Sequence, residues 1–104
     1  MSEPGIFDRH EMQRVMLSAG VVPRDLAKIM PCHHATLYAY FKTGVARPLT
    51  LFSFERIYGF LRQAFNEGVL PFNGPVRDRP AFIKKEFDNW HFNSGNFGGG
   101  NKQE

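Results

Sequence analysis

The side chains best suited to chemistry in this sequence are the consecutive residues Cys32, His33 and His34. Thiolates and imidazoles bind zinc, but neighbours on a helix point in different directions, and the sequence offers no second cluster to complete a tetrahedral site. His10 and His91 are isolated. The sequence also lacks a phosphate-binding loop, suggestively spaced acids, and a base near a nucleophile. We therefore expect no metal, no cofactor and no enzymatic activity, and the sequence points to a binding function.

These three residues lie inside a stretch, residues 23–48, that we expect to fold as two short helices joined by a tight corner. Leu26 and Met30 are four residues apart, as on one face of a first helix. Leu37 and Tyr40 are three apart, as on one face of a second helix over residues 33–42.

The corner between the two helices has its own residue pattern. Cys32 is a small apolar residue at the corner, and Ala27 would let the two backbones approach closely. Pro31 disfavours the α conformation in the residue before it, so the first helix should end near Ile29.

On these residues the stretch resembles the DNA-binding helix-turn-helix of the Cro and phage-repressor family. The resemblance covers about a quarter of the chain. Matching positions are Leu26-Ala27, Cys32, Thr36-Leu37, Gly44 and Pro48. Two positions depart from the family pattern: Pro31 replaces a glycine that is usually left-handed, and Gly44 comes one residue late.

The resemblance implies sequence-specific binding of double-stranded DNA by a small transcriptional regulator of the phage-repressor type. The helix 33–42 would lie in the major groove as the recognition helix. Its groove-facing residues would be His33, His34, Ala35, Tyr38, Ala39 and Lys42, and the phosphate-facing residues outside it would be Arg24, Lys28 and Arg47.

This recognition helix is unusual because it lacks the Gln, Asn and Arg side chains that make bidentate base contacts. His33 and His34 can also be read simply as exposed polar residues at a helix start. One alternative function is therefore a protein-binding module on the same scaffold, such as a phage inhibitor of a host protein, with an aromatic contact surface. RNA binding through exposed aromatic residues is a third option.

Composition fits a DNA-binding protein without proving one. The 104 residues carry a net charge of +3, and residues 21–66 hold six basic residues against two acidic ones. A single cysteine excludes an internal disulfide and fits a cytoplasmic protein. No signal peptide and no membrane-spanning apolar run is expected.

The rest of the chain predicts an all-α fold, a compact bundle of four to five helices. Helices are expected over residues 9–19 and 49–67 and from Arg79-Pro80 onward, with a short strand as the alternative for the last. Residues 1–92 would form one helix-turn-helix domain with a C-terminal helical extension. Residues 93–104, rich in Gly and Asn, would form a disordered tail.

The helix 49–67 carries apolar residues around about half its circumference, more than one buried face requires. Phe54, Tyr58 and Phe65 form one edge of this arc and are expected to be the interface of a homodimer. The alternative is that residues 82–90 fold back over the same edge within one chain.

Overall fold

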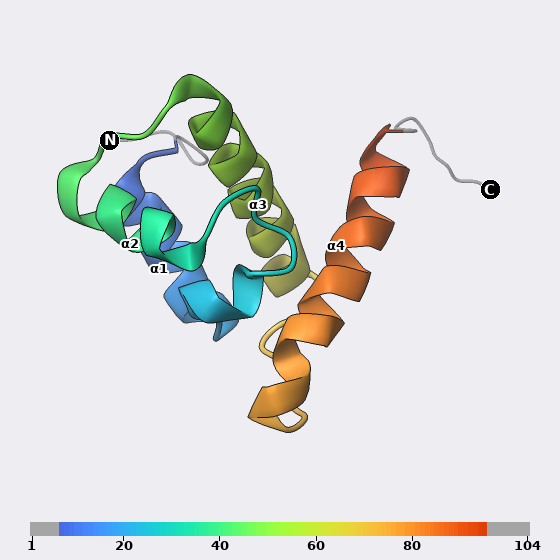
Figure 1. The fold of residues 1–104 in the computed structure, drawn as a ribbon. Coiled ribbons are helices and arrows are strands. Elements are labelled where there is room, and N and C mark those ends of the chain that lie inside the picture. Colours follow the sequence, from blue (N-terminus) through green and yellow to red (C-terminus); the bar gives the residue numbers. More distant parts are fainter. Residues whose placement is uncertain (1–6, 96–104) are drawn as a thin grey trace.

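The computed structural model describes residues 7–95, with side chains for residues 7–90, and within this range the protein is all-α without strands (Figure 1). This confirms the predicted all-α fold, with four α-helices where four to five were expected, and it rejects the strand alternative for the C-terminal segment. The elements are α1 (Arg9–Ala19), the 3-10 helix η1 (Pro23–Leu26), α2 (His34–Thr43), α3 (Pro48–Asn66), the 3-10 helix η2 (Val76–Asp78) and α4 (Arg79–Gly95).

Helix α1 has the bounds that its sequence predicts. The Asp8 side chain accepts a hydrogen bond from the Glu11 amide at 2.8 Å and so caps the helix start. Gly20 ends the helix with a φ of 71°, a left-handed conformation that suits glycine. One apolar stripe of this helix is buried and consists of Met12, Val15, Met16 and Ala19.

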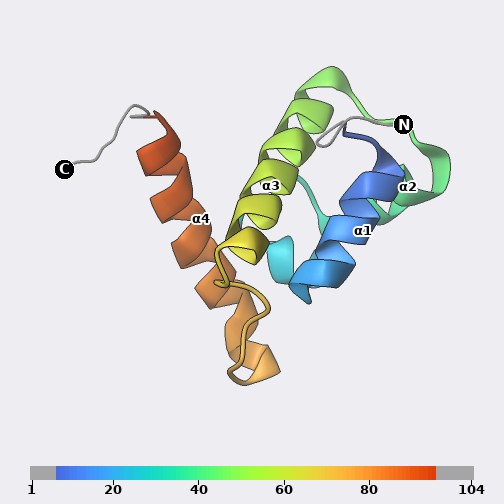
Figure 2. The same ribbon diagram turned by 180° about the vertical axis from the view of Figure 1, so that it is seen from behind.

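Helix α3 lies between α1 on one side and α4 on the other in both views of the molecule (Figures 1 and 2). Its apolar arc is wide because it packs on both sides. Ile57 and Leu61 are buried in the core. Phe60 faces α4, where its ring contacts those of Phe87 and Trp90 at centroid distances of 5.4 and 5.8 Å.

Helix α4 extends to Gly95, beyond the domain end expected at residue 92. Residues 93–95, which were expected to begin the disordered tail, belong to this helix. The helix thus continues past the last strongly apolar residues. The remainder of the predicted tail, residues 96–104, lies outside the described residues. In the part of the chain that the structure describes, no helix is long and apolar enough to cross a membrane.

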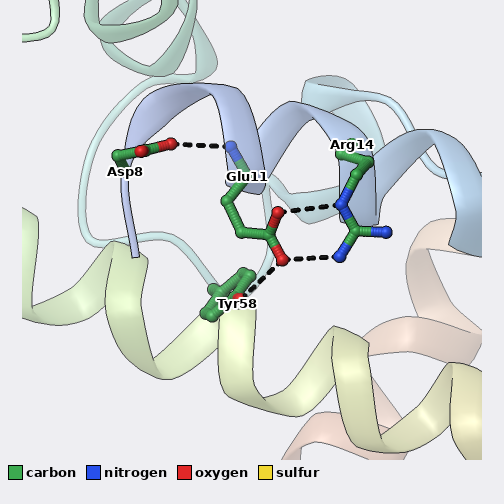
Figure 3. Close-up of polar contacts among 4 residues, drawn as sticks. All are labelled: Asp8, Glu11, Arg14 and Tyr58. Atoms are coloured by element: carbon green, nitrogen blue, oxygen red, sulfur yellow. Dashed lines mark hydrogen bonds and ion pairs between the residues drawn. The ribbon is translucent and has the colours of Figure 1, made fainter. Parts of the chain in front are cut away.

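The predicted dimer interface on α3 is wrong for two of its three residues. Phe54 is 0% exposed and Tyr58 is 4% exposed, both covered by their own chain. Phe54 packs on Tyr40 of α2, and Tyr58 packs on Phe7 and donates a hydrogen bond to Glu11 at 2.9 Å (Figure 3).

The alternative, in which residues 82–90 cover that edge, is wrong for the same two residues. That segment covers Phe60, whereas Phe54 and Tyr58 are covered from the side of α1 and α2. A helical wheel shows how much of α3 is apolar but not which element covers each side. Phe65, the third predicted interface residue, is 44% exposed.

Candidate nucleic-acid interface

The candidate interface begins with a helical segment that is shorter and tighter than expected. η1 is one 3-10 turn, and a further hydrogen bond from the Met30 amide to the Leu26 carbonyl at 3.0 Å continues the turn. Pro31 then stops it, and His34 begins α2. Because Pro23 and Pro31 enclose so short a segment, 3-10 winding replaces the predicted α-helix.

This winding changes which side chains meet at the corner. Leu26 is fully buried, whereas Ala27, predicted to lie at the close approach of the two helices, is exposed. The expected inward pair, Leu26 and Met30, is buried. Ala27 follows Leu26 directly, and a 3-10 turn advances about 120° per residue, so these two side chains lie on different faces. Cys32 is half-buried and packs against the core, as expected for the corner residue.

Helix α2 has one inward and one outward face. Leu37 and Tyr40 are buried, and Phe41 packs partly against the core, as the residue spacing predicts. The outward side chains are exposed, and they are Ala35, Tyr38, Ala39 and Lys42. Tyr38 is 53% exposed, a large fraction for an aromatic ring in the middle of a helix.

The start of α2 is organised by the two histidines. His33 is the N-cap residue, and its Nδ1 atom accepts a hydrogen bond from the Ala35 amide at 3.1 Å. The His33 and His34 rings stack with centroids 4.2 Å apart. Tyr38 contacts His34 edge-on at 6.2 Å, so the three rings form a continuous aromatic row at this end of the helix.

The end of α2 is held by a residue that sequence reasoning missed. Arg9 of α1 donates a hydrogen bond from Nη1 to the Lys42 carbonyl at 3.1 Å. A cation here also interacts favourably with the negative end of the helix dipole. Gly44 ends the helix with a φ of 77°, and a Cβ at this position would lie 3.1 Å from Arg9 Nη1. No local signal could reveal this contact, because 33 residues separate its two partners.

Four basic side chains flank or end the exposed face of α2. Arg24 belongs to η1, Lys28 to the turn after it, Lys42 to the last turn of α2, and Arg47 is the N-cap residue of α3. All four are exposed, and none forms an ion pair within the described residues. Their charges are therefore available to a partner in solution.

The nearest acid in this segment does not cancel those charges. Asp25 is 4% exposed, and its carboxylate accepts hydrogen bonds from the Val22 amide at 2.9 Å and from Arg79 Nε at 2.7 Å. The Arg79 guanidinium compensates the buried charge. This ion pair also connects η1, the first segment of the candidate interface, to the first turn of α4.

The histidines and the cysteine do not assemble a metal site within the described residues, where no three His, Cys, Asp or Glu side chains come close enough to hold an ion. The nine predicted DNA-contacting residues thus lie along the chain from η1 to the start of α3. Eight are exposed, with Tyr38 among them, and the ninth, His34, is half-buried under its ring contacts. Ala35 and Ala39 complete the exposed face between the rings and Lys42.

In a comparison with known proteins, no protein-family model, no curated protein and no solved structure matches the chain.

Proposed function

We propose that this protein binds double-stranded DNA in a sequence-dependent manner, as a small transcriptional regulator that inserts α2 into the major groove. The observation that carries this proposal is the exposed face of α2, a short helix anchored at both ends by His33 and Arg9. Ten residues of α-helix span about 15 Å, and the major groove, about 12 Å wide, admits such a helix.

The side chains on this face can make a few direct contacts with base edges. Tyr38 can exchange a hydrogen bond with a base edge, and Ala35 and Ala39 can contact thymine methyl groups. Because phosphate contacts supply most of the affinity in such complexes, the basic residues around α2 would position the protein on the backbone. A regulator of this kind acts in the cytoplasm, and the one cysteine, Cys32, is free.

The proposal is tested by measuring duplex binding as a function of salt. With about four phosphate contacts per subunit, log K should fall with log salt with a slope of about −3.6. Lys42→Ala should weaken binding to all sequences and make the slope shallower by about 0.9. Lys85→Ala is the matched control, because Lys85 is also exposed but lies on α4, outside the segment from η1 to the start of α3 that carries the candidate interface. Equal effects of the two variants, or no binding at about 50 mM salt, would reject the proposal.

A second candidate function is a protein-binding module, and a specific set of residues favours it. Three apolar side chains that follow α2 in the chain are strongly exposed: Val45 at 74%, Leu49 at 82% and Phe52 at 58%. Leaving apolar side chains in water forgoes roughly 1.5–3 kcal/mol each, so a partner surface is expected there. This candidate predicts a protein complex that forms without DNA.

A further inference from the structure

His33, the N-cap residue of α2, caps the helix with a titratable imidazole ring. His33 has the extended backbone of an N-cap residue, with φ −65° and ψ 148°, and its Nδ1 atom accepts the Ala35 amide hydrogen. A ring nitrogen can accept a hydrogen bond only while it carries no proton. The capped state of α2 therefore requires a neutral His33 ring with its proton on Nε2.

Protonation of His33 would act against the helix in two ways. The new proton on Nδ1 would remove the acceptor for the Ala35 amide, leaving a helix-terminal donor without its partner. The positive charge would also lie at the positive end of the helix dipole, where cations are unfavourable. Ser, Thr, Asp and Asn, the residues most often found at this position, do not have this weakness.

Among the described residues, His33 has no ion-pair partner. The ring in contact with it belongs to His34, itself titratable, and Tyr38 contacts His34 in turn. Within the described residues, no carboxylate and no cation of η1, α1 or α3 forms a hydrogen bond or ion pair with His33. Two stacked imidazoles would repel each other when both are charged, which adds to the cost of protonation.

We infer that His33 is a positioning residue whose neutral ring holds the first turn of α2 in place, so that acid loosens the face presented to DNA. The consequence for DNA binding rests on the function proposed above. Ala35 and Tyr38 lie in the first two turns, so fraying of this end displaces both of them. Loss of the His33 cap should therefore lower the affinity for DNA in acid. This effect opposes the attraction between a charged imidazole and phosphate.

The cap is tested on the free full-length protein by NMR between about pH 8 and pH 5.5, where imidazoles ordinarily gain a proton. In the wild type, the amide signal of Ala35 should move with pH, and nitrogen spectra of the ring should show Nδ1 unprotonated at pH 8. His33→Asn, which keeps a capping acceptor but does not titrate, should remove most of the movement. His34→Asn should preserve it. An Ala35 signal that ignores pH, or that moves equally in His33→Asn, would overturn the inference.

The consequence for DNA is tested with the same proteins and His33→Ala at both pH values. His34 is present in both the wild type and His33→Asn, so the ratio of affinities at pH 5.5 and pH 8 is compared between them. This ratio should be about fivefold lower in the wild type than in His33→Asn, the loss expected for a removed cap. His33→Ala should bind weakly at both values. If His33→Asn is as weak as His33→Ala at pH 8, His33 contacts DNA directly and the positioning role is wrong. If no variant binds DNA, the proposed function fails, whereas the NMR result still decides the cap.

Discussion

Glu11 joins helices α1 and α3 through its carboxylate (Figure 3). It accepts hydrogen bonds from the Arg14 guanidinium and, at 2.9 Å, from the hydroxyl of Tyr58. The hydrogen bonds from Arg14 lower the pKa of Glu11 to about 2, opposed by partial burial and assisted by Tyr58. Burial in turn raises the pKa of Tyr58, and the Glu11 carboxylate raises it further. The buried phenol thus has a charged partner, which explains how a polar group fits in the α1–α3 contact.

This cluster predicts how stability depends on pH. Because folding lowers the pKa of Glu11, its contribution is complete above the ordinary value of 4.5 and is lost as the pH falls toward about 2. Glu11→Gln should therefore lower the thermal midpoint at pH 6, and the difference from the wild type should shrink almost to zero near pH 2. The exposed Glu55 provides the control, since Glu55→Gln should change the midpoint little at either pH. A Glu11→Gln difference that stays constant over this range would show that the carboxylate charge is not what stabilises the contact.

At the scale of elements, α3 has a glycine at the place where α4 approaches it. Gly59 faces the ring of Trp90, and a Cβ built on it would lie 3.8 Å from the ring, an ordinary contact distance. Trp90 is fixed there by its indole N–H, which donates to Gln63 at 3.0 Å. The approach of the two helices is therefore close, but it leaves room for one methyl group.

We predict that Gly59→Ala stabilises the protein by about 0.5–1 kcal/mol, because alanine loses less backbone entropy in a helix interior and fits under the ring. Thermal or urea unfolding measures the change. Gly20→Ala is the contrasting variant: its φ of 71° strains any other residue, and its Cβ would lie 3.0 Å from that of Pro71. It should destabilise the protein. If Gly59→Ala also destabilises, α4 lies closer to α3 than described.

At the scale of the whole molecule, the exposed apolar residues do not lie where the helical pattern placed them. Val45, Leu49 and Phe52 lie at the connection from α2 and in the first turns of α3. Phe65 lies in the last turn of α3, and the polar residues Asn66 and Glu67 follow it. One helix-turn-helix of this type reads a half-site, and specificity usually comes from a two-fold pair. The start of α3 is therefore the better candidate surface for a homodimer.

We predict a homodimer at micromolar concentration, with a mass by light scattering of twice the 11.9 kDa of one chain. Phe52→Glu should yield monomers, because a carboxylate cannot be buried unpaired in an apolar interface. Phe65→Glu is the matched control and should leave the mass unchanged. A dimer that survives Phe52→Glu but not Phe65→Glu would move the interface to the end of α3. A wild-type monomer would reject the homodimer and assign the exposed apolar residues to a different protein.

The sequence alone determined the features that depend on local interactions. The Asp8 cap and Gly20 mark both ends of α1, and the spacing of Leu37 and Tyr40 gave the inner face of α2. The starts expected at Leu49 and at Arg79-Pro80 lie within a residue of the observed starts of α3 and α4. Hydrogen bonds and caps within a helix join residues only a few positions apart, so the sequence contains both partners of each interaction.

Only the tertiary structure decided the contacts that join distant residues. It placed Phe54 and Tyr58 in the core, wound the segment after Pro23 as a 3-10 turn with Ala27 outward, and brought Arg9 to the end of α2. It also paired Asp25 with Arg79, which lies 54 residues away along the chain. Apolar patterns state how much of a helix is buried, but the choice of covering element depends on packing among all the helices at once, which no local pattern contains.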